Sequence, residues 1–506
     1  MAQVTPQITK ETDSNHSLSK NSTDNEEVTI SIIKTLSRSD ACFPTQAQAA
    51  FNSDVEKKIS RKETQTATTP EKKVYSYSKK AGFLGLMGIA GIMGPLASSM
   101  HVPALKAIMS EFQTDYSTAS ITVTVFLVAI GIGPLIWAML SDAYGRKWFT
   151  VASMVIFALG SVGCALSTGI EMLIVMRLIQ GLGSAAPMVI GIGVISDVFP
   201  RSEMGRAIGL FTIGPLLGPV IGPIIGGYMS QYVGWRALFY LITGLAVLMG
   251  VLVAVFMEET LDPSKRLPKP IARSKDTGKL EFSKELPNPF SCLLFLKHID
   301  VVLLCTWASF IFGSYYAISI SQPITVGIQN NLTTSQVGLT FIAIGVGNIL
   351  GSTGSGYLSD YIVNNYSKKN NGQTPPPELR LKITLMGAVV IIAALLMNGW
   401  FISNEFHIAA VLFAQFLVGA SMVSMFSGIS NYYVETFPGR SASVSACNAC
   451  VRVIFAAITS AITPLLLDSI GVGNTFTFYA GLQILGLIIL ICMIFFGPRI
   501  RAITRS

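Results

Sequence analysis

The sequence is poor in charge. Only 13% of its 506 residues are charged, whereas an ordinary soluble protein has about 25%. Together with 51% hydrophobic residues, this scarcity excludes an ordinary soluble domain and predicts a polytopic membrane protein. The net charge of +8 is spread over the segments between apolar runs, so binding of nucleic acid is not indicated.

Several chemical motifs are also absent. No G-x-x-x-x-G-K-[ST] run occurs, because Gly278-Lys279 lacks the upstream glycine and the hydroxyl residue, so ATP is not the expected energy source. The apolar runs contain no cluster of His, Cys and carboxylates, and we expect neither an enzyme nor a metal or other cofactor. Cys447-x-x-Cys450 lacks a βαβ context, which favours buried thiols over disulfides or a redox motif.

Twelve apolar runs follow one another, each of about 20 residues, the length needed to cross a hydrocarbon core. We place them near 82–101, 117–140, 148–169, 171–196, 206–230, 235–257, 299–322, 335–358, 381–401, 406–432, 441–467 and 474–496. The expected fold class is therefore an all-α integral membrane protein. The charged segment after residue 257 separates six runs from six, which predicts two six-helix bundles.

Lysine and arginine gather in alternate connections. Counted from a cytosolic N-terminus, the cytosolic segments hold eight of them between 258 and 298, together with Arg146, Lys147, Arg201, Arg206, Lys368, Lys369, Arg380, Lys382, Arg440, Arg499, Arg501 and Arg505. The opposite loops hold only Lys106 and Arg236. By the positive-inside rule both termini are predicted to be cytosolic.

The predicted organisation has five parts. Residues 1–80 are polar and lack apolar periodicity, so we expect a disordered cytosolic tail. Two six-helix bundles follow at 81–257 and 299–496, joined by a cytosolic linker at 258–298, and residues 497–506 form a second cytosolic tail.

The two halves share a short sequence repeat. Gly133, Leu140, Ser141 and Asp142 recur as Gly351, Leu358, Ser359 and Asp360, and Asp197-Val-Phe-Pro200 is echoed by Glu435-Thr-Phe-Pro438. Each copy lies at the cytosolic end of the equivalent run. Two parallel halves related by an axis along the membrane normal place a central site between them.

The first copy continues into a longer motif, Gly133-Pro-Leu135, Ser141-Asp142 and Gly145-Arg146-Lys147. This motif resembles the cytosolic signature of the major facilitator superfamily, and the resemblance extends from about residue 81 to residue 499. It implies that Asp142 and Arg146 latch the halves in the outward-facing state, Asp142 against the start of span 11 and Arg146 against Asp197. The alternative is a stop-transfer cluster that only fixes topology.

The second copy is incomplete. It has Asp360 and Glu435, but Val363-Asn364-Asn365 stands where the first copy has Gly-Arg-Lys. We therefore expect the first copy to be the stronger latch.

Span 4 contains Arg177 and Gln180, which share a helix face by their spacing. A buried arginine is costly in a membrane and is a functional candidate by default. Exporters of the superfamily have an Arg-x-x-Gln-Gly motif here that is linked to proton coupling, which the resemblance carries to Arg177 and Gln180. The alternative is an arginine that snorkels to the outer interface.

Span 5 is unusually rich in glycine and proline between Gly209 and Gly227. Gly214, Gly218, Gly222 and Gly226 recur every four residues, and Pro215, Pro219 and Pro223 each follow a glycine. The spacing keeps the glycines near one face and lets another helix approach closely. We expect that helix to be span 8 of the other half.

The same run resembles the superfamily's antiporter signature, with Gly209, Gly218, Gly222, Pro223, Gly226 and Gly227 at its six fixed positions. The resemblance implies a twelve-span drug:proton antiporter of the fungal multidrug resistance type.

The candidate substrate cavity combines one cation with aromatic and amide groups. Asn448 and Arg452 lie one turn apart in span 11 and suit an anionic group, or else form a structural polar link to a neighbouring helix. The remaining candidates are Trp307, Phe310, Tyr315 and Tyr316 of span 7, Asn348 of span 8 and Gln415 of span 10. The span 7 aromatics suit planar or cationic ligands, although such residues also face lipid or pack.

Two isolated positions remain. His101 ends span 1 and is read as an interfacial histidine without a task. Asn331 begins an Asn-Leu-Thr sequon on an outer loop, but its closeness to span 8 leaves glycosylation open.

The combined prediction is a monomeric, proton-coupled secondary transporter that exports small organic molecules such as drugs, organic cations, polyamines or weak acids. Its partners are the substrate, protons and the lipid bilayer, and the plasma membrane is implied by the resemblance. The alternatives are a transporter-like membrane sensor and a proton-coupled nutrient importer.

Overall fold

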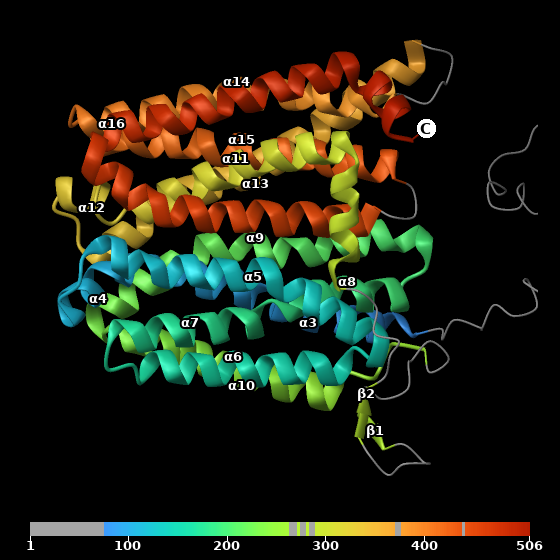
Figure 1. The fold of residues 1–506 in the computed structure, drawn as a ribbon, viewed down its shortest axis with the longest axis horizontal. Coiled ribbons are helices and arrows are strands. Elements are labelled where there is room, and N and C mark those ends of the chain that lie inside the picture. Colours follow the sequence, from blue (N-terminus) through green and yellow to red (C-terminus); the bar gives the residue numbers. More distant parts are fainter. Residues whose placement is uncertain are drawn as a thin grey trace, which may run out of the picture. The chain divides into compact units, whose positions relative to one another are not determined.

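The structure is a computed structural model that describes residues 75–262, 271–273, 280–282, 289–369, 376–437 and 441–505. The greater part of the predicted N-terminal tail, residues 1–74, lies outside this range. Nearly all the described residues are helical, as the apolar runs predict (Figure 1).

The first half contains six membrane-spanning segments. Its helices are α3 (Tyr77–Met100), α5 (Tyr116–Tyr144), α6 (Lys147–Ala165), α7 (Ile170–Ser184), α8 (Ala186–Val198), α9 (Arg201–Tyr232) and α10 (Trp235–Phe256), with the short η1 (Val102–Ala104) and α4 (Leu105–Phe112) after α3. Span 4 is broken into α7 and α8 at Ala185. Pro187 is the second residue of α8 and has no backbone N–H to continue the helix ladder.

The second half repeats this plan. Its helices are α11 (Ile299–Ser321), α12 (Val326–Gln329), α13 (Thr334–Lys369), α14 (Glu378–Ser403), α15 (Ile408–Thr436) and α16 (Ser441–Arg505). Length and composition give 11 helices able to cross a membrane. Since α16 is interrupted at Gly471, whose φ of 78° is not helical, it makes two crossings, and the arrangement is consistent with the predicted twelve spans.

The structure describes three parts of the connection between the halves beyond residue 262, two strands and a short helix. A two-stranded antiparallel hairpin, β1 (Ile271–Arg273) and β2 (Leu280–Phe282), pairs Ile271 with Phe282. The 3₁₀ helix η3 (Pro289–Lys297) then crosses the direction of the spans and leads into α11 (Figure 1).

The boundary of the predicted tail moves slightly. Helix α3 begins at Tyr77, four residues before the expected start at 81. Within its first turn Lys79 pairs with Glu258 at 2.5 Å and Lys80 pairs with Glu203 at 3.0 Å. These lysines therefore belong to the helical bundle rather than to the tail.

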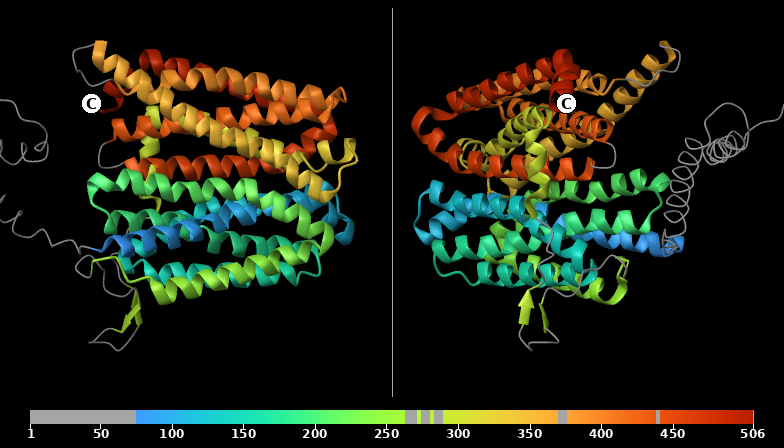
Figure 2. Two further views of the ribbon diagram at one scale, coloured as in Figure 1. Left: turned by 180° about the vertical axis from the view of Figure 1, so that it is seen from behind. Right: turned by 45° about the vertical axis from the view of Figure 1, so that its right-hand side comes forward.

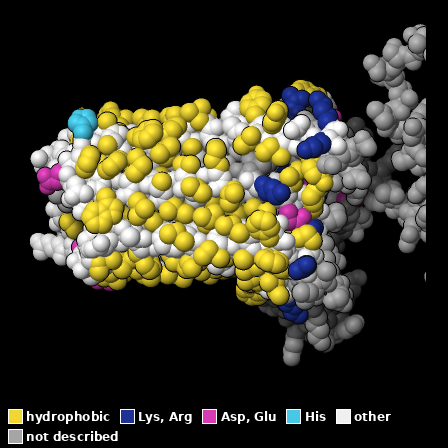
Figure 3. Space-filling model, turned by 90° about the horizontal axis from the view of Figure 1, so that it is seen from above, with side chains coloured by type: hydrophobic (Ala, Val, Ile, Leu, Met, Phe, Trp, Pro, Cys, Tyr) yellow, Lys and Arg dark blue, Asp and Glu magenta, His cyan; other side chains and the backbone are white. Residues whose placement is uncertain are grey.

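The two six-helix bundles lie side by side with their long helices running in similar directions (Figures 1 and 2). Apolar side chains cover most of the visible face, while Lys and Arg gather at one end (Figure 3). We call this end, where Tyr75 and Arg505 lie, the basic end, and the opposite one the distal end. An apolar belt with charges at its margin is the surface that a bilayer requires.

The bundles contact each other in their distal halves. The Tyr116 hydroxyl donates to the Ile320 carbonyl, and Ser335 donates to Gln231 through its backbone N–H at 2.9 Å and its hydroxyl at 2.6 Å. An apolar cluster from both halves fills the same region, namely Val102, Leu105, Tyr116, Ala119, Val123, Leu127, Ile320, Phe341, Val453 and Ala457. The space between the bundles is thus closed on the distal side.

The glycine row of α9 faces a different partner from the one expected. A Cβ on Gly218 would lie 2.7 Å from Pro95 Cβ, and one on Gly222 would meet Ser99 and Leu96. The row therefore packs on α3 of its own bundle, and the prediction that it faces span 8 is wrong. Another face of α9 does reach span 8, because a Cβ on Gly227 would lie 2.6 Å from the Thr334 carbonyl of α13.

Candidate functional site

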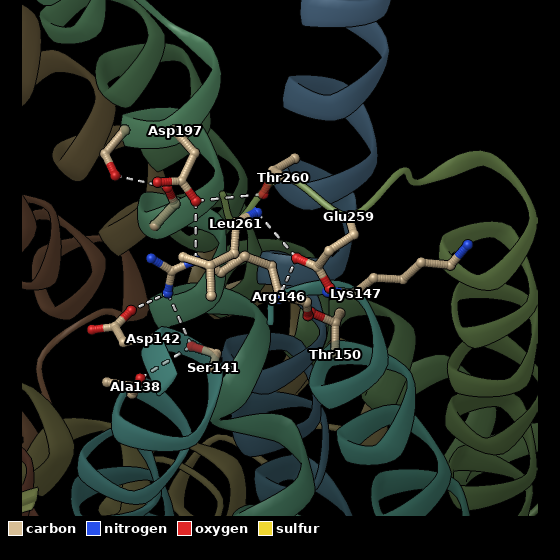
Figure 4. Close-up of polar contacts among 12 residues, drawn as sticks. Ala138, Ser141, Asp142, Arg146, Lys147, Thr150, Asp197, Glu259, Thr260 and Leu261 are labelled. Atoms are coloured by element: carbon tan, nitrogen blue, oxygen red, sulfur yellow. Dashed lines mark hydrogen bonds and ion pairs between the residues drawn. The ribbon is translucent and has the colours of Figure 1, made fainter. Parts of the chain in front are cut away.

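The first polar cluster surrounds Arg146 at the basic end of the N-terminal bundle (Figure 4). Its guanidinium donates to Asp197 through Nε at 3.1 Å and to the Ser141 hydroxyl through Nη1 at 3.1 Å, and it also pairs with Asp142. Arg146 is only 7% exposed. The ion pair between Arg146 and Asp197 that the motif implies is therefore present.

The turn that places Arg146 depends on glycine. Gly145 has a φ of 129°, which side chains rarely adopt. A Cβ on Gly133, which lies earlier in α5, would be 2.6 Å from Ala185 Cβ. Both motif glycines thus have a steric role in bringing the ends of α5 and α6 to span 4.

Glu259 completes this cluster and was not predicted. Its carboxylate accepts the backbone N–H groups of Arg146 at 2.8 Å and Lys147 at 3.2 Å (Figure 4). These are first-turn donors of α6, which have no partner inside the helix, and a negative charge is favourable at a helix N-terminus. The acidic pair at 258–259, directly after span 6, was the available sequence signal.

Asp142 is the most accessible member of the cluster. Its side chain is 60% exposed, whereas that of Asp197 is 21% exposed. Its ion pair is with Arg146 of its own bundle. In this distally closed arrangement, Asp142 is accessible for other partners.

The C-terminal bundle has a matching cluster around Arg380. The guanidinium donates to Glu435 through Nε at 2.7 Å and to the Ser359 hydroxyl through Nη1 at 2.8 Å. These partners match Asp197 and Ser141 in the sequence repeat. The arginine missing from the second motif copy is thus supplied by the start of α14. The Asp360 side chain lies outside the described ones.

Arg177 lies inside the N-terminal bundle, fully buried. Its guanidinium donates to the carbonyls of Thr122 at 3.2 Å and Ala97 at 3.3 Å and to Gln180 Oε1 at 2.7 Å. The Phe126 ring centroid lies 4.1 Å from its central carbon. The arginine therefore ties α7 to α3 and α5, and does not snorkel to the distal interface.

The network continues on either side of Arg177. Gln180 donates to the Ser161 hydroxyl at 2.8 Å, and His101 Nε2 lies 2.7 Å from the Thr122 hydroxyl. His101 is 2% exposed, so its interpretation as an interfacial histidine is wrong. It shares Thr122 with Arg177, a contact that sequence spacing could not show.

Arg452 has a different setting in the C-terminal bundle. It lines a cavity of about 160 Å³ together with Phe426, Ser430, Tyr433, Ser445 and Asn448. Its central carbon lies 4.7 Å from the Phe426 centroid and 4.9 Å from that of Phe312. Within the described residues, Arg452 Nε and Asn448 Oδ1 are buried and have no hydrogen-bond partner. The residues that line the cavity therefore include two polar groups whose hydrogen-bonding capacity is not met by the protein.

Comparison with known proteins identifies the family. Residues 87–446 match the sequence profile described as Major Facilitator Superfamily. The chain belongs to this superfamily.

Its similarity to fungal members of the superfamily extends over most of the chain. It is 31% identical to the MFS transporter cpaT of Aspergillus oryzae over 87% of this chain and 91% of that protein. It is also 31% identical to the efflux pump radE of Floropilus chiversii, covering 84% and 81% of the two proteins. The Dityrosine transporter 1 of Saccharomyces cerevisiae is 29% identical, with 80% and 78% covered.

A solved structure shows the same fold. A bacterial homologue of the human lysosomal transporter Spinster superposes with a TM-score of 0.63 at 12% identity, covering 82% of this chain and 97% of that one. This superfamily protein is therefore a multi-pass membrane transporter and not an enzyme.

The other predicted cavity residues have diverse settings. Phe310 stacks edge-on with Phe455 at 5.5 Å, and Tyr316 approaches Ser98 of the other bundle at 3.4 Å. Tyr315 is buried against Tyr316. Of these three residues, Tyr316 is the one shown to reach the other bundle.

Three of the predicted cavity residues are buried in packing or polar contacts within the C-terminal bundle. Trp307 is fully buried, and a Cβ on Gly486 of α16 would contact its ring. Gln415 accepts from Gln322 at 3.0 Å and donates to Asn398 at 3.3 Å. Asn348 faces Gly419 of α15. None of the three is among the residues that line the Arg452 cavity.

Asn331 lies on the distal loop before α13 and is exposed. Its φ of 51° is left-handed, a conformation that asparagine tolerates better than most residues. Its predicted glycosylation stays a prediction.

Proposed function

We propose that this superfamily transporter exports small organic molecules in exchange for protons by alternating access. Its basic end faces the cytosol, so both termini are cytosolic, and the membrane is the plasma membrane. The protein acts as a monomer. The excess of Lys and Arg at the basic end supports this orientation by the positive-inside rule.

The observation that supports loading from the cytosol is the position of the open space. The bundles meet through the distal cluster, while Ser430, Ser445 and Asn448 border the Arg452 cavity within about three turns of the basic end. A substrate therefore loads from the basic side in this arrangement. Loading from the cytosol is the first step of export.

Proton coupling is assigned to the Arg177 and Gln180 network. A fixed positive charge beside protonatable or hydrated groups changes their proton affinity, and the network spans α3, α5, α6 and α7. The glycine row holds α3 and α9 close together. This contact keeps the N-terminal bundle rigid and limits leakage while the bundles rock.

The latch groups at the basic end control the rocking motion. In the distally closed state Asp142 is exposed, and in the opposite state it docks at the start of α16. The Arg146 and Arg380 clusters hold the ends of their own bundles in shape, so each bundle moves as a unit.

Transport in sealed vesicles tests this function. Inside-out vesicles with an acidic lumen are expected to accumulate substrate, with proton release from the lumen. Candidate substrates come from a growth screen of deletion and overexpressing strains against diverse toxic compounds. Accumulation driven by protons moving with the substrate would establish an importer. Binding without substrate-dependent proton flux would establish a sensor.

A further inference from the structure

The membrane interior of this protein carries positive charge without a matching carboxylate. Arg177 and Arg452 lie within apolar runs, whereas each Asp and Glu of the described spanning helices lies at the end of a run. These acids are Asp142, Glu171, Asp197, Glu203, Asp300, Asp360, Glu378, Glu435 and Asp468. A buried charge is expensive unless a partner compensates it, so the partner of each arginine decides its role.

Arg177 is compensated by the protein. Two backbone carbonyls and the Gln180 amide oxygen accept its hydrogen bonds, and only Nη2 is both buried and without a partner. Adding an anion here would displace contacts that join three helices. The hydrogen-bond donors of Arg177 are therefore mostly occupied by acceptors of the protein itself.

Among the described residues, the contacts given for Arg452 are with aromatic faces. Phe312 and Phe426 flank its guanidinium within 5 Å, which favours a cation but provides no hydrogen-bond acceptor. Its Nε is buried and unpartnered, and Asn448, 8% exposed, has an unpartnered amide oxygen one turn away. The guanidinium has a planar set of donors that matches the two oxygens of a carboxylate.

We propose that the Arg452 cavity binds the carboxylate of an organic acid, so the transported molecules are organic anions rather than organic cations or polyamines. Phe426 contacts the apolar or aromatic part of the acid, and the Ser430 and Ser445 hydroxyls and the Asn448 amide bind its remaining polar atoms. This inference rests on the proposed transport function and names its substrate class.

The size of the cavity is suited to enclosing the acidic group of a substrate rather than the whole molecule. Its volume of about 160 Å³ is well below the roughly 300–1,000 Å³ of sites that enclose a drug-sized molecule. The cavity therefore holds one end of a larger substrate, and the rest extends between the bundles. A cation at the same place would be repelled by Arg452, and the lining contains no carboxylate to offset that repulsion.

Three probes that differ only in charge test the proposal. They are 3-phenylpropanoate, 3-phenylpropanamide and 3-phenylpropylamine, titrated by calorimetry into the full-length protein in lipid nanodiscs without a gradient. We expect the carboxylate to bind at least tenfold more tightly than the amide, and the amine not to bind saturably. Equal or tighter binding of the amine, or no carboxylate binding at millimolar concentration, would overturn the proposal.

Variants of Arg452 show whether this residue causes the preference for a carboxylate. Arg452→Gln is expected to weaken carboxylate binding by about 10- to 100-fold, the effect of losing hydrogen bonds to a charged group, and to leave amide binding unchanged. Arg452→Lys retains the charge and is expected to retain part of the preference. Arg236→Gln, at the distal end beside Glu111, is the matched control. An unchanged preference for the carboxylate in Arg452→Gln refutes the role of this cavity. If that variant does not fold, an unchanged preference in both Arg452→Lys and Asn448→Ala has the same meaning.

The binding and transport assays separate the two claims. Arg452-dependent carboxylate binding without proton-driven transport leaves the charge preference standing and refutes antiport. Proton-driven export of a cation without carboxylate binding refutes the charge preference and leaves antiport standing.

Discussion

Each bundle has an arginine within a membrane span, and the surroundings of the two side chains differ. Arg177 donates to carbonyls and an amide of its own bundle, whereas Arg452 lies between two aromatic rings at the wall of a cavity. Both are cations within a membrane helix, Arg177 buried and Arg452 partly buried, and sequence spacing treats them alike. The comparison teaches that the hydrogen-bond acceptors around a buried charge, more than its burial, separate a structural group from a ligand-binding one.

The same contrast applies at the basic end. Glu259 accepts two backbone N–H groups of α6, while Asp142 is mostly exposed beside Arg146. One carboxylate holds a helix end, and the other is accessible to move between partners. Among the arginines as among the carboxylates, one side chain is held by contacts within the protein and the other is not.

The largest effect is expected for Arg177→Ala. The change leaves the Ala97 and Thr122 carbonyls without their donor, at about 1–3 kcal/mol for each buried group, and it removes the charge assigned to proton coupling. We expect a clear fall in thermal stability and loss of proton-driven transport. Arg452→Ala, measured in parallel, should abolish carboxylate binding with little change in melting temperature. Equal stability losses in the two variants would break the comparison.

Gly222→Leu is expected to have the next largest effect. Its side chain would collide with Ser99 and Leu96 of α3, and overpacking of this kind costs roughly 1–3 kcal/mol. Transport should be lost or replaced by leakage, measured as uncoupled proton entry into vesicles. Gly209→Leu is the matched control in the same helix, because nothing lies within 4 Å of a Cβ there. If Gly209→Leu proves as harmful, close packing is not the reason for the glycines.

Glu259→Gln should cause a smaller loss. An amide at this position can still accept hydrogen bonds, but the favourable charge at the start of α6 is removed, which is worth about 0.3–1 kcal/mol. We expect a lower melting temperature in detergent and nearly normal transport. Glu258→Gln serves as the comparison, since Glu258 pairs with the exposed Lys79. Identical melting curves for the two variants would argue against a special role of Glu259.

Asp142→Asn should change stability least. The side chain is largely in solvent, and the Arg146 guanidinium retains Asp197 and Ser141 as partners. Expression and melting temperature are expected to stay normal, while turnover falls several-fold because the opposite state loses its latch. Normal turnover at saturating substrate would refute the latch role proposed for Asp142.

The sequence by itself determined the number and order of the helices. Runs of about 20 apolar residues have one stable state in a bilayer, since every backbone group must be paired within the segment. The resemblance of the motif to the superfamily signature implied that Arg146 would meet Asp197, and the two do form an ion pair. Arg452 and Asn448 were predicted to share a face, and they do line one cavity.

Tertiary structure decided which partners those faces meet. Helical periodicity shows that Gly214, Gly218 and Gly222 share a face, but it does not show which neighbouring helix approaches them, and that helix is α3. Arg380, at the start of α14, takes the place of the arginine that the second motif copy lacks. The two arginines within the spans differ for the same reason. The carbonyls of Ala97 and Thr122, distant in the chain, accept hydrogen bonds from Arg177, whereas aromatic rings and a cavity adjoin Arg452.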